Sequence, residues 1–254
     1  MKKILAFALV CVLALALVAC GDKPAETTAA PVETTAAPVE TTEAPVETTA
    51  APVVAAMSYA EYDAAELDTP VVIEAYVQAT QSWWDNKITV YAADEDGAYF
   101  IYEMACSKED AAKLTPGTKI RVNGYKGAWA GEVEIMYGTF EFVEGGDTYI
   151  AEALDVTELL GTDELIKHQN QLAVFKGMTV EAIEYKNGEP GDDIYVTLGL
   201  NGASYDFCVE VYLTGTDSEV YTTVGTLNVG DTVDVTGFIY WYEGVNTHIT
   251  GISK

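Results

Sequence analysis

The sequence predicts a mainly β protein whose folded part contains two similar units, one after the other. Beyond residue 56, short segments alternate apolar and polar residues, which is typical of half-buried strands. Glycine-containing turns separate these segments. One pattern occurs twice, as LTPGTKIRVNGY over residues 114–125 and as LNVGDTVDVTGF over residues 227–238. The repetition predicts two copies of one small fold, with boundaries at residues 57–153 and 154–254.

The first unit is expected to begin with a short helix, because Ser58 and Glu61 have the spacing of a capping box. The segment Asp94-Glu95-Asp96-Gly97 predicts a hairpin turn. Ser107 with Asp110 predicts the start of a second short helix. The expected strands are residues 71–79, 87–92, 98–105, 118–125 and 132–142.

The second unit repeats this order of elements. Thr162 to Leu165 is expected to begin its first helix, and Thr216 with Glu219 to cap its second. Its strands are expected over residues 173–185, 193–198, 204–213, 232–240 and 245–252.

Three strands, a helix and two further strands is the order of the OB-fold, a five-stranded Greek-key barrel. The segments Ile73-Glu74-Ala75 and Leu114 to Tyr125 resemble the tandem OB-fold modules of bacterial cell-surface lipoproteins. The resemblance implies two OB-fold-like barrels that bind ligands near the loops joining strands 1–2 and 4–5. A pair of β-sandwiches is the alternative fold, but it would not explain a helix at the same point of both copies.

The amino terminus carries the pattern of an exported, lipid-anchored protein. Lys2 and Lys3 precede an uncharged apolar run, Ile4 to Val18, that is shorter than a membrane-spanning helix. The following Leu17-Val18-Ala19-Cys20 resembles the lipobox of bacterial lipoproteins. This resemblance implies that residues 1–19 are a signal peptide and that Cys20 becomes the acylated, palmitate-bearing amino terminus. The protein is therefore expected outside the cytoplasm, anchored to the bacterial membrane by lipid. An ordinary secretory signal with an incidental cysteine is the alternative.

Residues 20–56 predict a tether rather than a domain. The unit ETTAAPV occurs four times from Glu26, with Glu43 as its only departure. A proline in every unit prevents a continuous helix, and no apolar face is available for packing. The segment is expected to be a disordered or polyproline-like spacer that reaches roughly 100 Å when fully extended.

The net charge of the chain narrows the classes of partner that are expected. The chain has 13 basic and 40 acidic residues, a formal charge of −27, and contains no basic run. Because nucleic-acid binding depends on neutralising phosphates with Lys and Arg, nucleic acid is not expected as a partner.

Cys106 and Cys208 lie in apolar strand contexts and are interpreted as buried thiols, with a disulfide between the units as the alternative.

Aromatic residues at the expected binding loops are the candidate ligand-binding residues. Adjacent residues of an extended chain point to opposite sides, so at least one of Trp83 and Trp84 is expected to project outward. Exposed aromatic faces stack on sugar rings, bases or peptide rings. Because the negative charge disfavours nucleic acid, a glycan or a protein is the expected ligand. The first unit is expected to be the one that binds it. The candidate residues are Trp83, Trp84, Tyr125, Trp129 and Trp241.

The sequence gives no catalytic, metal or cofactor site. His168 and His248 are the only histidines and fall in different elements of the second unit. No Ser-His-acid arrangement, zinc-ligand cluster or glycine-rich phosphate loop is found. The sequence therefore predicts a non-enzymatic binding protein. The alternatives are a structural or assembly module of a surface complex and, more distantly, an accessory domain of an extracellular enzyme system.

Overall fold

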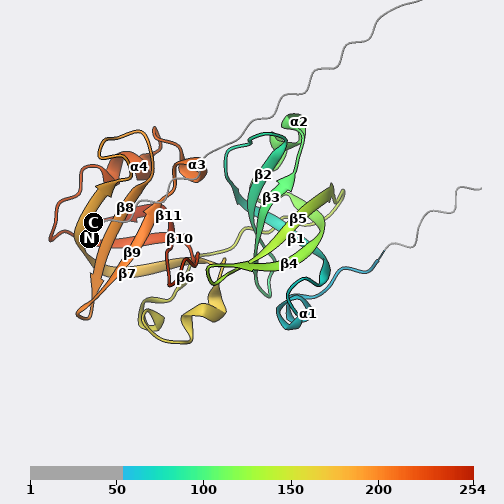
Figure 1. Cartoon of the computed structure of the whole chain (residues 1–254), viewed down its shortest axis with the longest axis horizontal. Helices are drawn as coiled ribbons and strands as arrows, with labels where there is room; N and C mark the ends of the chain where they lie inside the picture. The colour runs from blue at the N-terminus through green and yellow to red at the C-terminus, as the bar shows by residue number, and fades with distance from the viewer. Residues whose placement is uncertain (1–53) are drawn as a thin grey trace, which may run out of the picture. The chain divides into compact units, whose positions relative to one another are not determined.

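The computed structural model describes residues 54–254 (Figure 1). These residues belong to one compact unit, Ala51–Lys254. The predicted signal peptide, the acylated Cys20 and nearly all of the tether lie outside the described residues. Within the described part, no helix has both the length and the apolar character needed to cross a bilayer.

The first half of this unit is a closed five-stranded barrel. Its strands run in the order β1-β2-β3-β5-β4, and β4 pairs with β1 to close it. A short helix, α1, precedes the barrel, and α2 lies between β3 and β4, as expected. The bounds are α1 Tyr59–Ala64, β1 Pro70–Thr80, β2 Lys87–Ala93, β3 Ala98–Ala105, α2 Lys108–Ala111, β4 Lys119–Trp129 and β5 Glu132–Phe142.

The second half has the same strand order. Its sheet runs β10-β11-β9-β8-β7-β6, with an additional pairing between β10 and β7. A parallel pairing of β9 with β11 corresponds to the pairing of β3 with β5 in the first half. The bounds are β6 Leu154–Asp155, η1 Thr157–Leu159, η2 Leu165–His168, β7 Leu172–Tyr185, β8 Ile194–Leu200, β9 Ala203–Val209, α3 Val211–Thr214, α4 Glu219–Val224, β10 Thr232–Phe238 and β11 His248–Ser253.

The repeated glycines Gly124 and Gly237 lie where the two strands of each final hairpin approach closely. A Cβ atom at Gly124 would be 2.6 Å from Ile135 Cγ2 and 2.8 Å from the carbonyl oxygen of Met136. A Cβ atom at Gly237 would overlap the carbonyl oxygen of His248. Only glycine permits these approaches, so the repeated pattern in the sequence has a steric cause.

Helix starts agree with the sequence in the first half and differ in the second. Ser58 forms the predicted capping box with Glu61, and Ser107 accepts a hydrogen bond from the Asp110 N–H. The predicted cap at Thr216 is wrong, because Ser218 accepts from the Tyr221 N–H and starts α4 two residues later. The segment expected as a helix from Thr162 contains instead the single 3₁₀ turn η2.

Each half has its own apolar core. Alternate residues of β1 line the first core, as period-two burial requires. Alternate residues of β7 line the second core except at a bulge, where Lys176 and Gly177 are both exposed. The two cysteines of the described part, Cys106 and Cys208, are both free and buried. The buried-thiol interpretation is therefore confirmed, and the alternative disulfide is absent.

A third, smaller cluster joins the two halves. The ring of Tyr91 in β2 stacks on Phe238 in β10, with centroids 4.2 Å apart and planes 9° apart. The Tyr91 hydroxyl is hydrogen-bonded to Nδ1 of His248 at 2.8 Å. Burial lowers the pKa of His248 to about 4 and raises that of Tyr91, so both groups are neutral at pH 7. Neutral partners avoid the cost of burying a charge.

Glu132, at the start of β5, is a fully buried acid that also links the halves. Its Oε2 atom accepts a hydrogen bond from the Trp241 N–H at 2.8 Å, and Oε1 has no partner among the described residues. Burial raises the pKa of Glu132 to about 8. The carboxyl group is therefore mostly protonated at neutral pH, which reduces the cost of burying it in a low-dielectric region.

The pKa of Glu132 predicts how stability depends on pH. Its pKa rises from 4.5 in the unfolded chain to about 8, so the folded protein keeps a proton that the unfolded chain has released. Stability should fall as pH increases through this window, by up to about 1.4 kcal/mol per unit for one group. Glu132→Gln should reduce this fall between pH 6.5 and 8, whereas Glu141→Gln, an exposed acid of the same strand, should preserve it. Urea unfolding at several pH values measures both slopes, and an unchanged slope in Glu132→Gln would contradict the assignment.

Candidate functional site

The loop between β1 and β2 directs its two adjacent tryptophans to opposite sides, as the sequence predicted. The Trp83 ring packs against the first core, and its Nε1–H donates to the Cys106 carbonyl at 2.9 Å. The Trp84 side chain is 77% exposed. Trp83 is therefore a packing residue and Trp84 a surface residue.

A tight turn holds Trp84 in place. Trp84 and Lys87 exchange two backbone hydrogen bonds, of 3.0 and 2.9 Å, around the two central residues. Those residues, Asp85 and Asn86, have φ angles of 47° and 61°. Positive φ at both central positions is what a type I′ hairpin turn requires, and Asp and Asn tolerate it better than most residues. The turn thus fixes the point from which the exposed indole projects.

Next to Trp84 lies a groove of about 380 Å³, which we call the aromatic groove. Strands β2 and β3 supply part of its lining, including Tyr102, which is 44% exposed. Lys87 Nζ and Glu103 Oε2 form an ion pair at 2.6 Å beside it. The complete lining is Gln81, Ser82, Trp84, Lys87, Ile88, Thr89, Tyr102, Glu103 and Tyr212.

Tyr212, from α3 of the second half, completes the aromatic groove. The Ser82 N–H donates to the Tyr212 carbonyl at 2.6 Å, and Gln81 Nε2 donates to Glu210 Oε2 at 3.0 Å. Burial, followed by the neighbouring charge of Asp193, raises the pKa of Glu210 to about 7. These bonds attach the β1–β2 loop of one half to α3 of the other, so both halves contribute to the groove.

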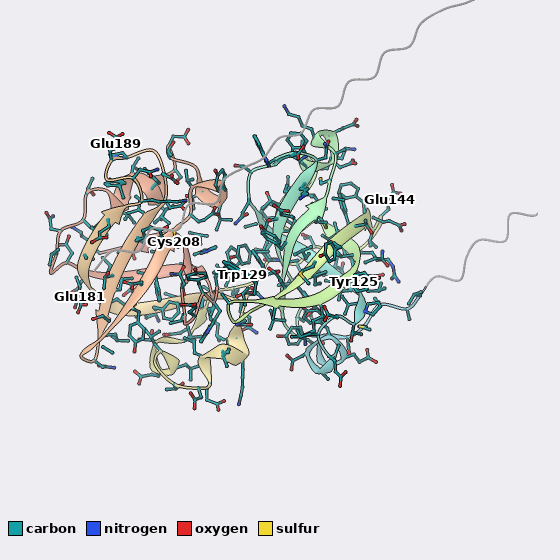
Figure 2. All side chains as sticks on the ribbon, viewed as in Figure 1. Tyr125, Trp129, Glu144, Glu181, Glu189 and Cys208 are labelled. Carbon is teal, nitrogen blue, oxygen red and sulfur yellow. The ribbon has the colours of Figure 1, made fainter. Side chains whose placement is uncertain are left out.

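Trp129 lies away from the aromatic groove, at the end of β4. Its ring centroid is 5.2 Å from that of Tyr242 in the second half, and its side chain is 56% exposed (Figure 2). The adjacent turn is tied to the same loop, because the Glu243 N–H donates to the Ala130 carbonyl at 2.7 Å. Trp129 thus packs partly against the second half while leaving one part of its ring open.

Tyr125 and Trp241 occupy two further places. Tyr125 is 45% exposed and pairs edge-to-face with Tyr137, at 6.4 Å between centroids (Figure 2). Trp241 is half-buried against the second core and lines a hollow of about 520 Å³ together with Tyr205 and Tyr242. Of the five aromatic candidates, Trp84 alone is among the residues that line the aromatic groove.

Sequence reasoning missed Tyr102 and Tyr212. Tyr102 lies next to Glu103, whose φ of 44° marks an irregularity in β3 that breaks the inward–outward alternation. Tyr212 is distant in sequence, and no local signal connects it with Trp84. The polar Glu103 gave no signal for the exposure of Tyr102, because strict alternation would have placed Tyr102 inward, and the position of Tyr212 required the tertiary structure.

The described residues 54–254 offer no candidate metal site, and both of their histidines have side-chain partners. This part of the chain contains no group of three or more His, Cys, Asp or Glu side chains positioned to hold a metal ion. His248 is buried at the contact between the halves, and His168 hydrogen-bonds Gln171 at 3.0 Å. The geometry that is present, exposed rings beside a polar groove, is suited to reversible binding.

No family model matches the chain, and no curated protein matches it either. Solved structures do match. One is a murine DNA-binding protein bound to double-stranded DNA, with 13% identity, 72% of this chain and 94% of that chain covered, and a TM-score of 0.34. A HINa domain in complex with double-stranded DNA has 12% identity, 74% and 96% coverage and a TM-score of 0.35. A replication protein A heterotrimer bound to single-stranded DNA has 12% identity, 69% and 45% coverage and a TM-score of 0.31.

These matches correct one expectation from the sequence. The high negative charge was taken to exclude nucleic acid as a partner, yet the three matched structures are described as DNA-binding or DNA-bound. The physical reason for the correction is that a total charge over the whole chain does not describe one face of one barrel. The exclusion of nucleic acid is therefore withdrawn, and no ligand is assigned to this chain from these matches.

The different surroundings of the two tryptophans predict opposite effects on stability. Trp83→Ala removes a packed ring and a hydrogen bond, so it should lower the free energy of unfolding by about 2–4 kcal/mol. Trp84→Ala should change it by no more than about 0.5 kcal/mol, because the side chain is exposed. Urea denaturation of both variants measures the difference. Equal losses would show that Trp84 is also a packing residue.

Proposed function

We propose that this protein is a lipid-anchored surface protein, without catalytic activity, that presents two tandem OB-like barrels and binds its ligand at the aromatic groove. The observation that carries the proposal is the gathering of Trp84, Tyr102 and Tyr212 around one groove. Large aromatic side chains left open to water beside a concave surface are typical of binding sites. The repeated strand order of the two halves supports the tandem arrangement.

The anchoring part of the proposal is supported by the sequence. Acyl chains on Cys20 and the following tether would hold the barrels outside the bacterial membrane and clear of its surface. Labelled palmitate should attach to the wild-type protein and fail to attach to a Cys20→Ser variant, which should leave the membrane fraction. Equal labelling of both proteins would contradict the anchor.

A glycan or a protein is the proposed ligand class. The aromatic groove offers flat apolar faces together with hydrogen-bonding groups, among them Gln81 and Ser82. A volume of about 380 Å³ lies within the range of small-ligand pockets, roughly 300–1,000 Å³. Such a site can accept a sugar ring or a projecting side chain of a partner protein.

A different observation favours a second function, assembly with other surface proteins. Tyr125 and Tyr137 form an exposed pair on β4 and β5, outside the aromatic groove. Tyrosine is enriched at protein interfaces because it offers both an apolar ring and a hydrogen-bonding hydroxyl. In this second function Tyr137 would matter for association and Trp84 would not.

Binding measurements on residues 51–254, the compact unit, distinguish the two functions. A glycan array and a pull-down from cell-surface extract should each be run with wild type, Trp84→Ala and Tyr137→Ala. The proposed function predicts that Trp84→Ala weakens binding at least about fivefold, because a stacked ring contributes roughly 1–3 kcal/mol. Tyr137→Ala should bind as wild type. The reverse pattern would support the assembly function, and binding unaffected by either change would exclude the aromatic groove.

A further inference from the structure

We propose that the aromatic groove takes an uncharged oligosaccharide, with Tyr212 of the second half as a direct contact. The inference rests on the proposed function and narrows its ligand to one chemical class. It is carried by the charge of the groove, by the mixture of rings and polar groups in its lining, and by an adjoining hollow.

The aromatic groove is electrically balanced although the chain is strongly acidic. Lys87 and Glu103 are the only charged residues in its lining, and they neutralise each other at 2.6 Å. An anionic ligand would approach the Glu103 carboxylate, and a cationic ligand would approach the Lys87 ammonium group. A hydroxyl-rich uncharged ligand avoids both repulsions, because neighbouring hydroxyl groups can donate to the carboxylate and accept from the ammonium group.

The lining also has the two kinds of surface that a sugar ring needs. A pyranose has apolar C–H faces and a rim of hydroxyl groups that both donate and accept hydrogen bonds. Trp84, Tyr102 and Tyr212 supply apolar rings for the faces. Gln81 Nε2 and the Ser82 hydroxyl already donate to Glu210 and to the Tyr212 carbonyl, and the oxygen atoms of both side chains can accept hydrogen bonds from the rim.

An adjoining hollow points to a chain of sugars rather than a single one. A second cavity of about 380 Å³ shares Gln81, Ser82, Ile88 and Tyr212 with the aromatic groove. Because Tyr212 lines both, a ligand that fills both cavities contacts this residue in each of them. Longer oligosaccharides should therefore bind more tightly than a disaccharide.

The backbone geometry supports a fixed role for Tyr212. Its carbonyl accepts hydrogen bonds from both the N–H and the Oγ of Ser82, at 2.6 and 3.2 Å. The side chain remains 60% exposed. The backbone is thus held against the β1–β2 loop while the ring stays open to the groove, which reduces the entropy lost on binding.

The test is isothermal titration calorimetry on the chain from residue 21 to its end. The uncharged probes are cellohexaose, N-acetylchitohexaose, mannohexaose and xylohexaose, each with its disaccharide. The charged probes are hexagalacturonate, hexaglucosamine and a short single-stranded DNA. We expect at least one uncharged hexasaccharide to bind more tightly than every charged probe and more tightly than its disaccharide.

Variants show whether this binding uses the proposed contacts. Tyr212→Ala and Trp84→Ala should each weaken it at least about fivefold, and Tyr137→Ala, an exposed tyrosine elsewhere, should stay within about twofold of wild type. Thermal unfolding of each variant shows whether a loss of binding is caused by a loss of folding. Tyr212→Phe keeps the aromatic ring and should retain most of the affinity.

Two results would overturn the inference in different ways. In the first, a charged probe, or a protein from the pull-down, binds most tightly and loses this binding in Trp84→Ala. That result would refute the uncharged oligosaccharide as the ligand and leave the proposed function standing. Absence of any Trp84-dependent binding, to these probes or in the pull-down, would refute the inference and the proposed function together.

Discussion

The buried contact between the two halves is the constraint on which the aromatic groove depends. Tyr91, stacked on Phe238 and hydrogen-bonded to His248, holds β2 of the first half against β10 and β11 of the second. The β1–β2 loop can then donate hydrogen bonds to the segment that carries Tyr212. Without the contact, each half would keep its own core, but the groove would lose one side.

This contact also shows how a very acidic chain packs its two halves together. The carboxyl groups of Glu132 and Glu210 lie near the boundary. Burial raises the pKa of Glu132 to about 8 and that of Glu210 to about 7. Each accepts a hydrogen bond from the other half, Glu132 from the Trp241 N–H and Glu210 from the Gln81 amide. Partial protonation reduces the repulsion that ionised carboxylates would create there. The arrangement links the stability of the boundary to pH in the neutral range.

Local features were predictable from the sequence because their causes are local. The caps at Ser58 and Ser107 and the bounds of β3 and β5 follow from side-chain spacing and alternation. Gly124 and Gly237 belong to the repeated pattern that predicted two copies of one fold, and both lie where neighbouring strands approach closely. The cap of α4 was misplaced because Thr216 has a glutamate three residues later, whereas Ser218 caps the helix through the backbone N–H of Tyr221 and so leaves no such signal in the sequence.

The candidate site was harder to predict because it combines distant segments. Alternation predicted that Trp83 and Trp84 would separate, but not which of them would face the core. Trp129 was expected near the binding loops, yet it lies against Tyr242, since the β4–β5 hairpin reaches the second half. Tyr212 could not be anticipated, because its place in the groove depends on the docking of the two halves.

The most direct test of this account is differential scanning calorimetry of residues 51–254. If the two halves form one body, the protein should unfold in a single transition whose calorimetric and van't Hoff enthalpies agree. A Phe238→Ala variant, which loses the stacked ring, should shift this transition to lower temperature. Two separate transitions in the wild-type protein would contradict the account, because the halves would then fold independently and the groove would lack a fixed second side.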